Sequence, residues 1–169
     1  GRYTAASAIV EAADRLTEDD GGAHAGGGEQ FALLVGALRS LARGEHPSGL
    51  IVDSYLLRAM ALSGWAPGLD ECARCGAPGP HQAFVAQLGG TVCGDCAPVG
   101  SVRVDADTSS LLRALMAGEW DVVDDAPAGS IGAASGLIAA YAQWHLERGI
   151  RSLEHVSAAP EPQRAEGTR

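Results

Sequence analysis

The 169-residue sequence contains no lysine and no asparagine, and aromatic residues make up only 5% of it. All 12 basic residues are arginines, which fits a coding bias better than a function. Without lysine, the chain offers no side-chain amine for Schiff-base chemistry. The few aromatics argue against a large β-sandwich or barrel, since aromatic residues are enriched in strands.

Long apolar runs are absent too, so no segment of about 18 apolar residues is expected to span a membrane. The sequence opens with Gly1, not methionine, and shows no secretory leader. We therefore expect an N-terminal part of the protein to be missing. The net charge of −9 argues against strong non-specific nucleic-acid binding by this segment, because such binding depends on neutralising phosphates.

What is present is ordinary globular composition, with 46% hydrophobic and 20% charged residues. A chain of this length suits one medium domain, or one domain with a small appendage. It is long enough to bury a sizeable hydrophobic core.

The sharpest signal is a set of four cysteines, Cys72, Cys75, Cys93 and Cys96, which form two C-x2-C pairs separated by seventeen residues. Two such knuckles supply four thiolates to a tetrahedral site, the arrangement that zinc favours. Because four thiolates leave no open position for water, we predict a structural and not a catalytic zinc. Two disulfides, a redox-active pair, another metal or no metal remain the alternatives.

The segment between the cysteine pairs predicts a short β-hairpin, since residues 83–88 and 91–92 flank a Gly89-Gly90 turn. A hairpin would return the second pair to the first. His81 is a candidate fifth ligand, although a histidine after Pro80 is more typical of the surface. The segment lacks the aromatic platform and basic groove of single-strand binders.

Apolar residues at helical spacing predict five helices around this segment. Their expected ranges are about 4–18, 31–43, 48–63, 107–117 and 129–149. A glycine-rich loop is expected over 19–28 and a short strand over 99–104. The predicted fold class is mainly α, a helical bundle with an inserted four-cysteine zinc-binding knuckle pair and a short β-hairpin.

Helix ends are predicted from capping residues. Gly44, Gly64, Gly118 and Gly149 are expected to end four helices; Ser48 is expected to cap the third, and Asp107 or Thr108 the fourth. The domain organisation that follows is a helical domain in two parts, 2–69 and 99–156, a zinc-binding insertion over 70–98, and a disordered tail over 157–169.

No catalytic motif is present: the sequence has no Walker loop, dinucleotide fingerprint, H-E-x-x-H or G-x-S-x-G. Asp124-Asp125 is interpreted as a solvated turn in preference to a metal site. Met60, Met116 and Trp144 are interpreted as packing residues in preference to cofactor contacts. We therefore expect a protein that is not an enzyme.

Residues 63–76 read Ser-Gly-Trp-Ala-Pro-Gly-Leu-Asp-Glu-Cys-Ala-Arg-Cys-Gly. This string resembles the signature of the RecO family, recombination mediators of bacterial DNA repair. The likeness extends to Phe84, 89–93 and Cys96, and to residues 2–6, 33–34, 145–148 and 151–152. It covers roughly residues 2–156.

The resemblance implies an N-terminal OB-fold, absent from this chain, followed by a helical domain that carries a zinc site in many members. It implies binding and annealing of single- and double-stranded DNA, contacts with RecR and with the C-terminal tail of single-stranded-DNA-binding protein, and indirect assistance to RecA loading. It also implies a cytoplasmic, nucleoid-associated location in bacteria. The alternative is a zinc-stabilised helical regulator or enzyme unrelated to RecO.

Three residues near the end of the last helix are candidate DNA or partner contacts: His145, Arg148 and Arg151. His145 and Arg148 are three residues apart and share a helix face. One interpretation is favourable interaction of the arginines with the helix dipole. The other is a local basic patch that meets phosphate or an acidic partner tail.

Overall fold

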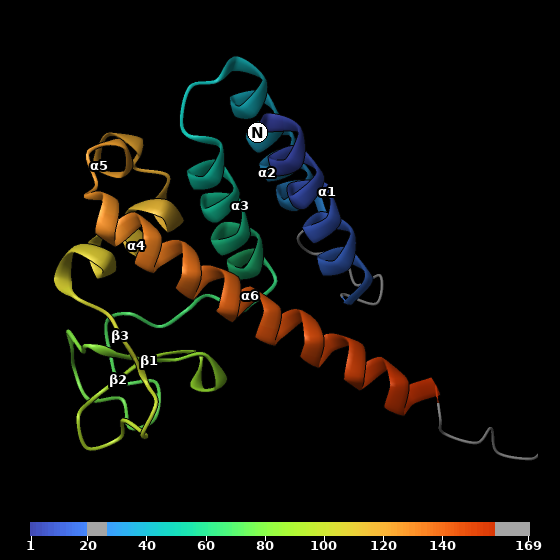
Figure 1. Ribbon diagram of the computed structural model, residues 1–169. Coiled ribbons are helices and arrows are strands. Elements are labelled where there is room, and N and C mark those ends of the chain that lie inside the picture. The colour runs from blue at the N-terminus through green and yellow to red at the C-terminus, as the bar shows by residue number, and fades with distance from the viewer. Residues whose placement is uncertain (20–26, 158–169) are drawn as a thin grey trace, which may run out of the picture.

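The computed structural model describes residues 1–19 and 27–157, and only the backbone of 18–19 and 148–157. Within these residues it is mainly helical, which confirms the predicted fold class (Figure 1). The helices are α1 (Arg2–Asp19), α2 (Gly27–Arg43), α3 (Ser48–Leu62), α4 (Ala106–Ala117), α5 (Trp120–Asp124) and α6 (Ala128–Ser157). The strands are β1 (Ala83–Val85), β2 (Gly90–Val92) and β3 (Val102–Arg103), with a 3-10 turn, η1 (Ala86–Leu88), after β1.

The helices form one hydrophobic core. Helices α1, α2 and α3 pack against one another, and α3 also packs against α4 and α6. Large side chains with under 2% exposure come from four of these helices, among them Ile9, Tyr55, Leu57, Leu112 and Ile138. Burying each such side chain contributes about 1.5–3 kcal/mol, and none of the four cysteines belongs to this core.

The three strands form an antiparallel sheet in the order β2-β1-β3, below the bundle in Figure 1. Phe84 pairs with Thr91 on β2 and with Val102 on β3. The Phe84 ring lies in the main core, edge-on to Tyr141 with centroids 5.7 Å apart. Its neighbour Val85 belongs instead to a small second cluster that includes Cys72. Successive side chains of a strand point to opposite faces, so β1 contacts both the main core and the second cluster.

The predicted hairpin and most predicted helix ends are confirmed. Gly89, at φ +81°, turns the chain between η1 and β2. Gly44, Gly64 and Gly118 follow α2, α3 and α4 at φ +69°, +85° and +75°, a region that favours glycine. The predicted strand near 99–104 is present as the two residues of β3.

Two predicted caps are wrong. Helix α3 is preceded by Pro47 at the N-cap position, and Ser48 is its first residue. Helix α4 is capped by Asp105, whose carboxylate accepts the Thr108 N–H at 2.8 Å. An N-cap side chain accepts a hydrogen bond from a backbone N–H two or three residues later. Asp105 accepts from Thr108 in this way, so the helix begins before the predicted cap.

Three further boundaries differ from the prediction. Asp19, Gly27 and Gly28 are helical, and the rest of the expected glycine-rich loop, residues 20–26, lies outside the described residues. Helix α6 does not end near Gly149 but continues to Ser157. An internal glycine costs a helix only about 1 kcal/mol, which good helix formers on both sides offset. The expected tail, apart from Ser157, lies outside the described residues.

Helix α5 was not predicted, so the described residues contain six α-helices instead of five. Asp124 and Asp125 are both exposed, as predicted, but Asp124 is the last residue of α5, not part of a turn, and it bonds to His46. The apolar residue that fixes this short helix is Val123, which is fully buried. One turn of helix is too short for the periodicity that reveals longer ones.

Met60 and Met116 pack in or against the main core, as predicted. Trp144 does not: its half-buried ring lines a separate cavity of about 670 Å³ between α6 and residues 98–102. The position one turn away, Tyr141, is the one that points into the core.

Candidate metal centre

The four cysteines lie close together in the loops next to the sheet. The Sγ atoms of Cys72, Cys75, Cys93 and Cys96 all lie within 4.8 Å of one another. Cys72 is buried, Cys75 is exposed, and the other two are half-buried. Such a group could hold a metal ion.

One sulfur–sulfur distance matches the edge expected around a small tetrahedral ion. Zinc–sulfur bonds of about 2.3 Å give a tetrahedron whose sulfur–sulfur edges are about 3.8 Å. The Cys75 and Cys93 Sγ atoms, one from each pair, are 3.8 Å apart. The residues present therefore fit a metal held entirely by thiolates.

Each cysteine pair is shaped by a tight turn. In the first turn, the Cys72 N–H donates to Ala77 O and the Gly76 N–H donates to Cys72 O, both at 2.8 Å. Gly76 adopts φ +73°, which only glycine accepts at little cost. In the second, the Cys96 N–H donates to Cys93 O at 3.0 Å.

Residues 68–73, the connecting segment, run beside β2 and bring the two turns together. Gly68 donates to Gly89 O at 2.9 Å and accepts from the Thr91 N–H at 2.8 Å. Ala73 donates to Thr91 O at 2.8 Å. This parallel pairing places Cys72, near the end of the segment, beside Cys93, the residue after β2.

The thiols have strongly divergent proton affinities. Burial acts to raise the pKa of Cys72, but backbone N–H groups led by that of Cys93 lower this pKa to about 6. Contact with the Cys93 thiol raises the pKa of Cys96 to about 12. The Ala77 N–H acts to lower the pKa of Cys75, but the neighbouring thiols raise it by more. Several thiolates this close repel one another, and a bound cation removes that penalty.

His81 lies outside this group. Its Nε2 atom is 2.9 Å from the carbonyl oxygen of Ala77. Among the described residues, the cluster that could hold a metal contains the four cysteines and not His81. His81 is half-buried, so the expectation of an exposed surface position after Pro80 is not met.

The family model described as "Recombination protein O C terminal" matches residues 1–154. This chain belongs to the RecO family. Among curated relatives, the DNA repair protein RecO of Streptomyces griseus subsp. griseus is 48% identical over 155 residues, which are 92% of this chain and 61% of the relative. Proteins with the same name from Streptomyces avermitilis and Streptomyces coelicolor are 46% and 47% identical over the same shares.

The chain thus spans about three fifths of the length of these RecO relatives. The residues that the family model matches contain the four-cysteine group and the helices around it. Among the described helices, none has the length and apolar character needed to cross a membrane.

The candidate contacts on α6 are placed only in part. His145 is half-buried, with its ring stacked on Trp65 at 5.1 Å and edge-on to Tyr141 at 4.5 Å. Arg148 and Arg151 belong to α6, but their side chains lie outside the described residues. Their role in binding stays a prediction.

A second feature of this RecO-family domain was missed from the sequence: a cavity of about 800 Å³ between α2, α3 and the α4–α5 region. Leu33, Leu62 and Met116 contribute apolar lining, and Arg58 and His46 contribute basic groups. Only one local signal pointed to it. Arg58 and Asp53 are the two charged residues of α3, a helix that is otherwise almost entirely apolar.

The charged and polar side chains that line this cavity differ in whether they already have hydrogen-bond or ion-pair partners. His46 stacks on Trp120, with centroids 4.0 Å apart, and its Nδ1 lies 2.8 Å from Asp124 Oδ2. The half-buried Arg58 has no hydrogen-bond or ion-pair partner among the described residues. Of the two carboxylates in the lining, Glu45 pairs with Arg43 at 3.2 Å, and Glu29 lies on α2. Arg58 is therefore available to an anion.

Proposed function

We propose that this chain is the helical domain of a non-enzymatic mediator of DNA repair and homologous recombination. The observation that carries the proposal is the family match over residues 1–154, which includes the four-cysteine group. A mediator needs surfaces for DNA and protein partners and no reacting centre. The absence of nucleotide-binding and hydrolase motifs from the sequence agrees with such a role.

The cofactor in this proposal is one structural Zn²⁺, held by Cys72, Cys75, Cys93 and Cys96. Four thiolates suit zinc, and a filled tetrahedron has no position for a substrate or a reactive water. The metal would hold together two loops that, within the described residues, are otherwise joined by a few hydrogen bonds and a small apolar cluster. Its role is thus to fix the shape of residues 70–98.

The proposed partners follow the family. They are single- and double-stranded DNA, RecR, single-stranded-DNA-binding protein and, indirectly, RecA, in the bacterial cytoplasm at the nucleoid. The charge of −9 makes this chain a poor general DNA ligand, so the main DNA contacts are assigned to an OB-fold outside it. His145, Arg148 and Arg151 remain candidates for a secondary contact with DNA or an acidic tail.

We place the acidic tail of single-stranded-DNA-binding protein in the cavity beside Arg58. Apolar residues of the tail would meet Leu33, Leu62 and Met116, and a carboxylate would meet Arg58, because His46 is already paired with Asp124. Support comes from charge complementarity, since Arg58 is half-buried and lacks an acidic partner within the described residues. A desolvated guanidinium gains more from a carboxylate than an exposed one does.

A genetic experiment tests the proposed function. The gene that encodes this chain is deleted in its host, and survival is measured after ultraviolet irradiation or DNA cross-linking. We expect the deletion to sensitise cells and to lower recombination frequency, and the intact gene to restore both. Normal survival and recombination in the deletion strain would favour the alternative, a helical regulator or enzyme unrelated to repair.

A further inference from the structure

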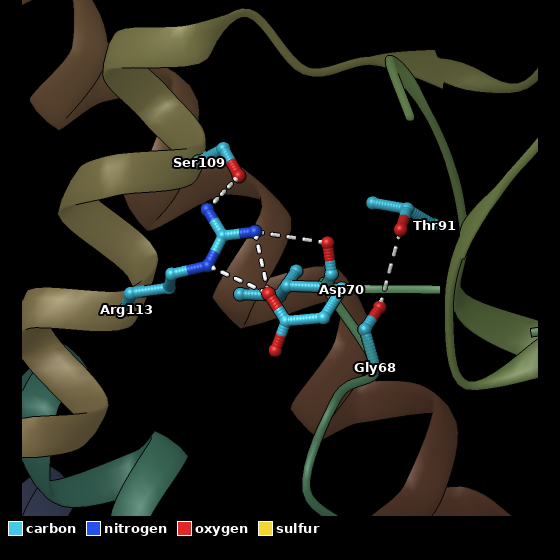
Figure 2. A network of polar contacts seen from close by, with 6 residues as sticks. Gly68, Asp70, Thr91, Ser109 and Arg113 are labelled. Carbon is cyan, nitrogen blue, oxygen red and sulfur yellow. Dashed lines mark hydrogen bonds and ion pairs between the residues drawn. The ribbon is translucent and has the colours of Figure 1, made fainter. Parts of the chain in front are cut away.

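The connecting segment is held from two sides. One side pairs with β2, as described above. On the other side, the guanidinium of Arg113, from α4, reaches the segment just before the first cysteine pair (Figure 2). Arg113 lies 43 residues from Asp70 in the sequence, so this contact joins two parts of the chain that only the fold brings together.

Arg113 uses most of its donors in this contact. Its Nε and Nη2 atoms donate to Asp70 Oδ1 at 3.1 and 2.9 Å, and Nη2 also donates to Leu69 O at 3.0 Å. Its Nη1 atom donates to Ser109 Oγ at 2.6 Å, which fixes the guanidinium on α4. Figure 2 shows the fork of the guanidinium directed at Asp70 from the α4 side.

The geometry of an extended chain explains why two anchors can act on one short segment. Successive carbonyl groups of a strand point to opposite sides, so Gly68 O meets the Thr91 N–H while Leu69 O meets Arg113. The Leu69 side chain, 3% exposed, is buried in the main core, whereas Cys72 belongs to the second cluster. Residues 69–70 are thus the junction between the helical bundle and the cysteine turns.

The backbone of Asp70 supports the first cysteine turn directly. The Asp70 carbonyl oxygen accepts the Gly79 N–H at 2.8 Å, next to an antiparallel bridge between Glu71 and Pro78. A Cβ on Gly79 would approach Asp70 O to 2.7 Å, so the two sides of this turn lie close together. Fixing Asp70 therefore also fixes the turn that carries Cys72 and Cys75.

We propose that Arg113 is a positioning residue for the metal site: by holding Leu69 and Asp70 to α4, it keeps Cys72 in place for the metal. The inference rests on the metal site proposed above. Arg113 has no hydrogen bond to any of the four cysteines. It acts by restricting the conformations that the loops can adopt before the metal binds. By linkage, metal binding must strengthen the Arg113–Asp70 contact by the same factor.

Zinc affinity, measured by competition with a chromophoric chelator, tests this inference on the whole chain. Partners behind metal ligands typically change metal affinity by 10–100-fold. Since Arg113 stands one step further out, we expect Arg113→Gln to raise the zinc Kd by about tenfold. Arg113→Lys, which keeps the charge but not the fork, should recover part of the loss.

Asp70→Ala is the second variant, because the Asp70 side chain is 86% exposed and its truncation leaves both cores intact. It should also raise the zinc Kd, and the double variant with Arg113→Gln should be no worse than Arg113→Gln alone. Arg15→Gln is the matched control. Arg15 forms a similar exposed ion pair with Glu11 at 2.7 Å, within α1, and its loss should leave zinc affinity unchanged.

Helix content, measured by circular dichroism, should stay at the wild-type level in every variant. A zinc Kd within about twofold of wild type in both Asp70→Ala and Arg113→Gln would overturn the inference while the metal site stands. If Arg113→Gln fails to fold, Asp70→Ala alone decides in the same way. A wild-type chain that binds no zinc would overturn both the site and the inference.

Discussion

The backbone N–H of Cys93 points at the Sγ atom of Cys72, 3.3 Å away. This one contact joins the first residue of each cysteine pair, and it exists because the connecting segment lies parallel to β2. An N–H directed at sulfur favours the thiolate, in keeping with the lowered pKa of Cys72. This contact thus favours the ionised form of the thiol, which is the form that binds a metal.

The parallel approach of Gly68 and Gly90 gives the first prediction. A Cβ on Gly90 would collide with backbone atoms of Gly68, which cannot move aside as a flexible side chain could. We expect Gly90→Ala to destabilise the chain by about 1–3 kcal/mol, as overpacking does, and to weaken metal binding. Gly94→Ala is the control, since a Cβ on Gly94 meets nothing within 4 Å. Urea denaturation measures both variants, and equal stability of the two would contradict the prediction.

The second prediction concerns Asp53, a nearly buried carboxyl on α3 that accepts a hydrogen bond from Ser135 on α6. Burial raises its pKa above 3.8, and the Ser135 bond opposes this. A raised folded-state pKa means that the native protein binds the proton more tightly than the unfolded chain does. Ionised Asp53 therefore lowers stability as the pH rises through the folded-state pKa, and the cost is absent below pH 3.8.

Asp53→Asn keeps an acceptor for Ser135 and removes the buried charge. We expect it to increase the free energy of unfolding at pH 7, with the gain shrinking as the pH falls towards 3.8. The comparison is made between variant and wild type at each pH, because loss of metal in acid affects both alike. A gain that does not change with pH, or a loss at pH 7, would show that the charge is not the cause.

The third prediction tests the cavity beside α3. Reversing the charge with Arg58→Glu should weaken binding of the acidic C-terminal peptide of single-stranded-DNA-binding protein by at least about tenfold, since attraction becomes repulsion. Fluorescence anisotropy with a labelled peptide at two salt concentrations measures this. Arg15→Glu, on an exposed face of α1, provides the control for net charge. Equal affinity of the Arg58 and Arg15 variants would place the peptide elsewhere.

The fourth prediction separates the metal segment from the bundle. Cys75 is exposed and Cys72 is buried, so Cys75→Ser removes a ligand with little change in packing. We expect this variant to lose its metal and its protection from hydrogen exchange over residues 70–98. The helices should keep theirs, because the main core contains none of the four cysteines. Helices that melt together with the loops would contradict this independence.

Local sequence patterns predicted the parts of this domain that depend on local physics. The two C-x2-C turns, the Gly89 turn and the ends of α2, α3 and α4 each follow from a few adjacent residues. Helix α5 and the end of α6 were missed, because one turn has no periodicity and a single glycine does not stop a strong helix. The Arg58 cavity and the Arg113–Asp70 contact join residues far apart in sequence, and only the fold brings them together.

The central claim, a structural zinc held by four thiolates, is tested most directly by metal analysis. The chain is purified without chelator or added metal, and its metals are counted by plasma mass spectrometry. The account predicts about one zinc per chain, in keeping with the filled tetrahedron, and almost none in the Cys75→Ser variant. Less than about half a zinc per chain in the wild type, or equal zinc in both proteins, would contradict it.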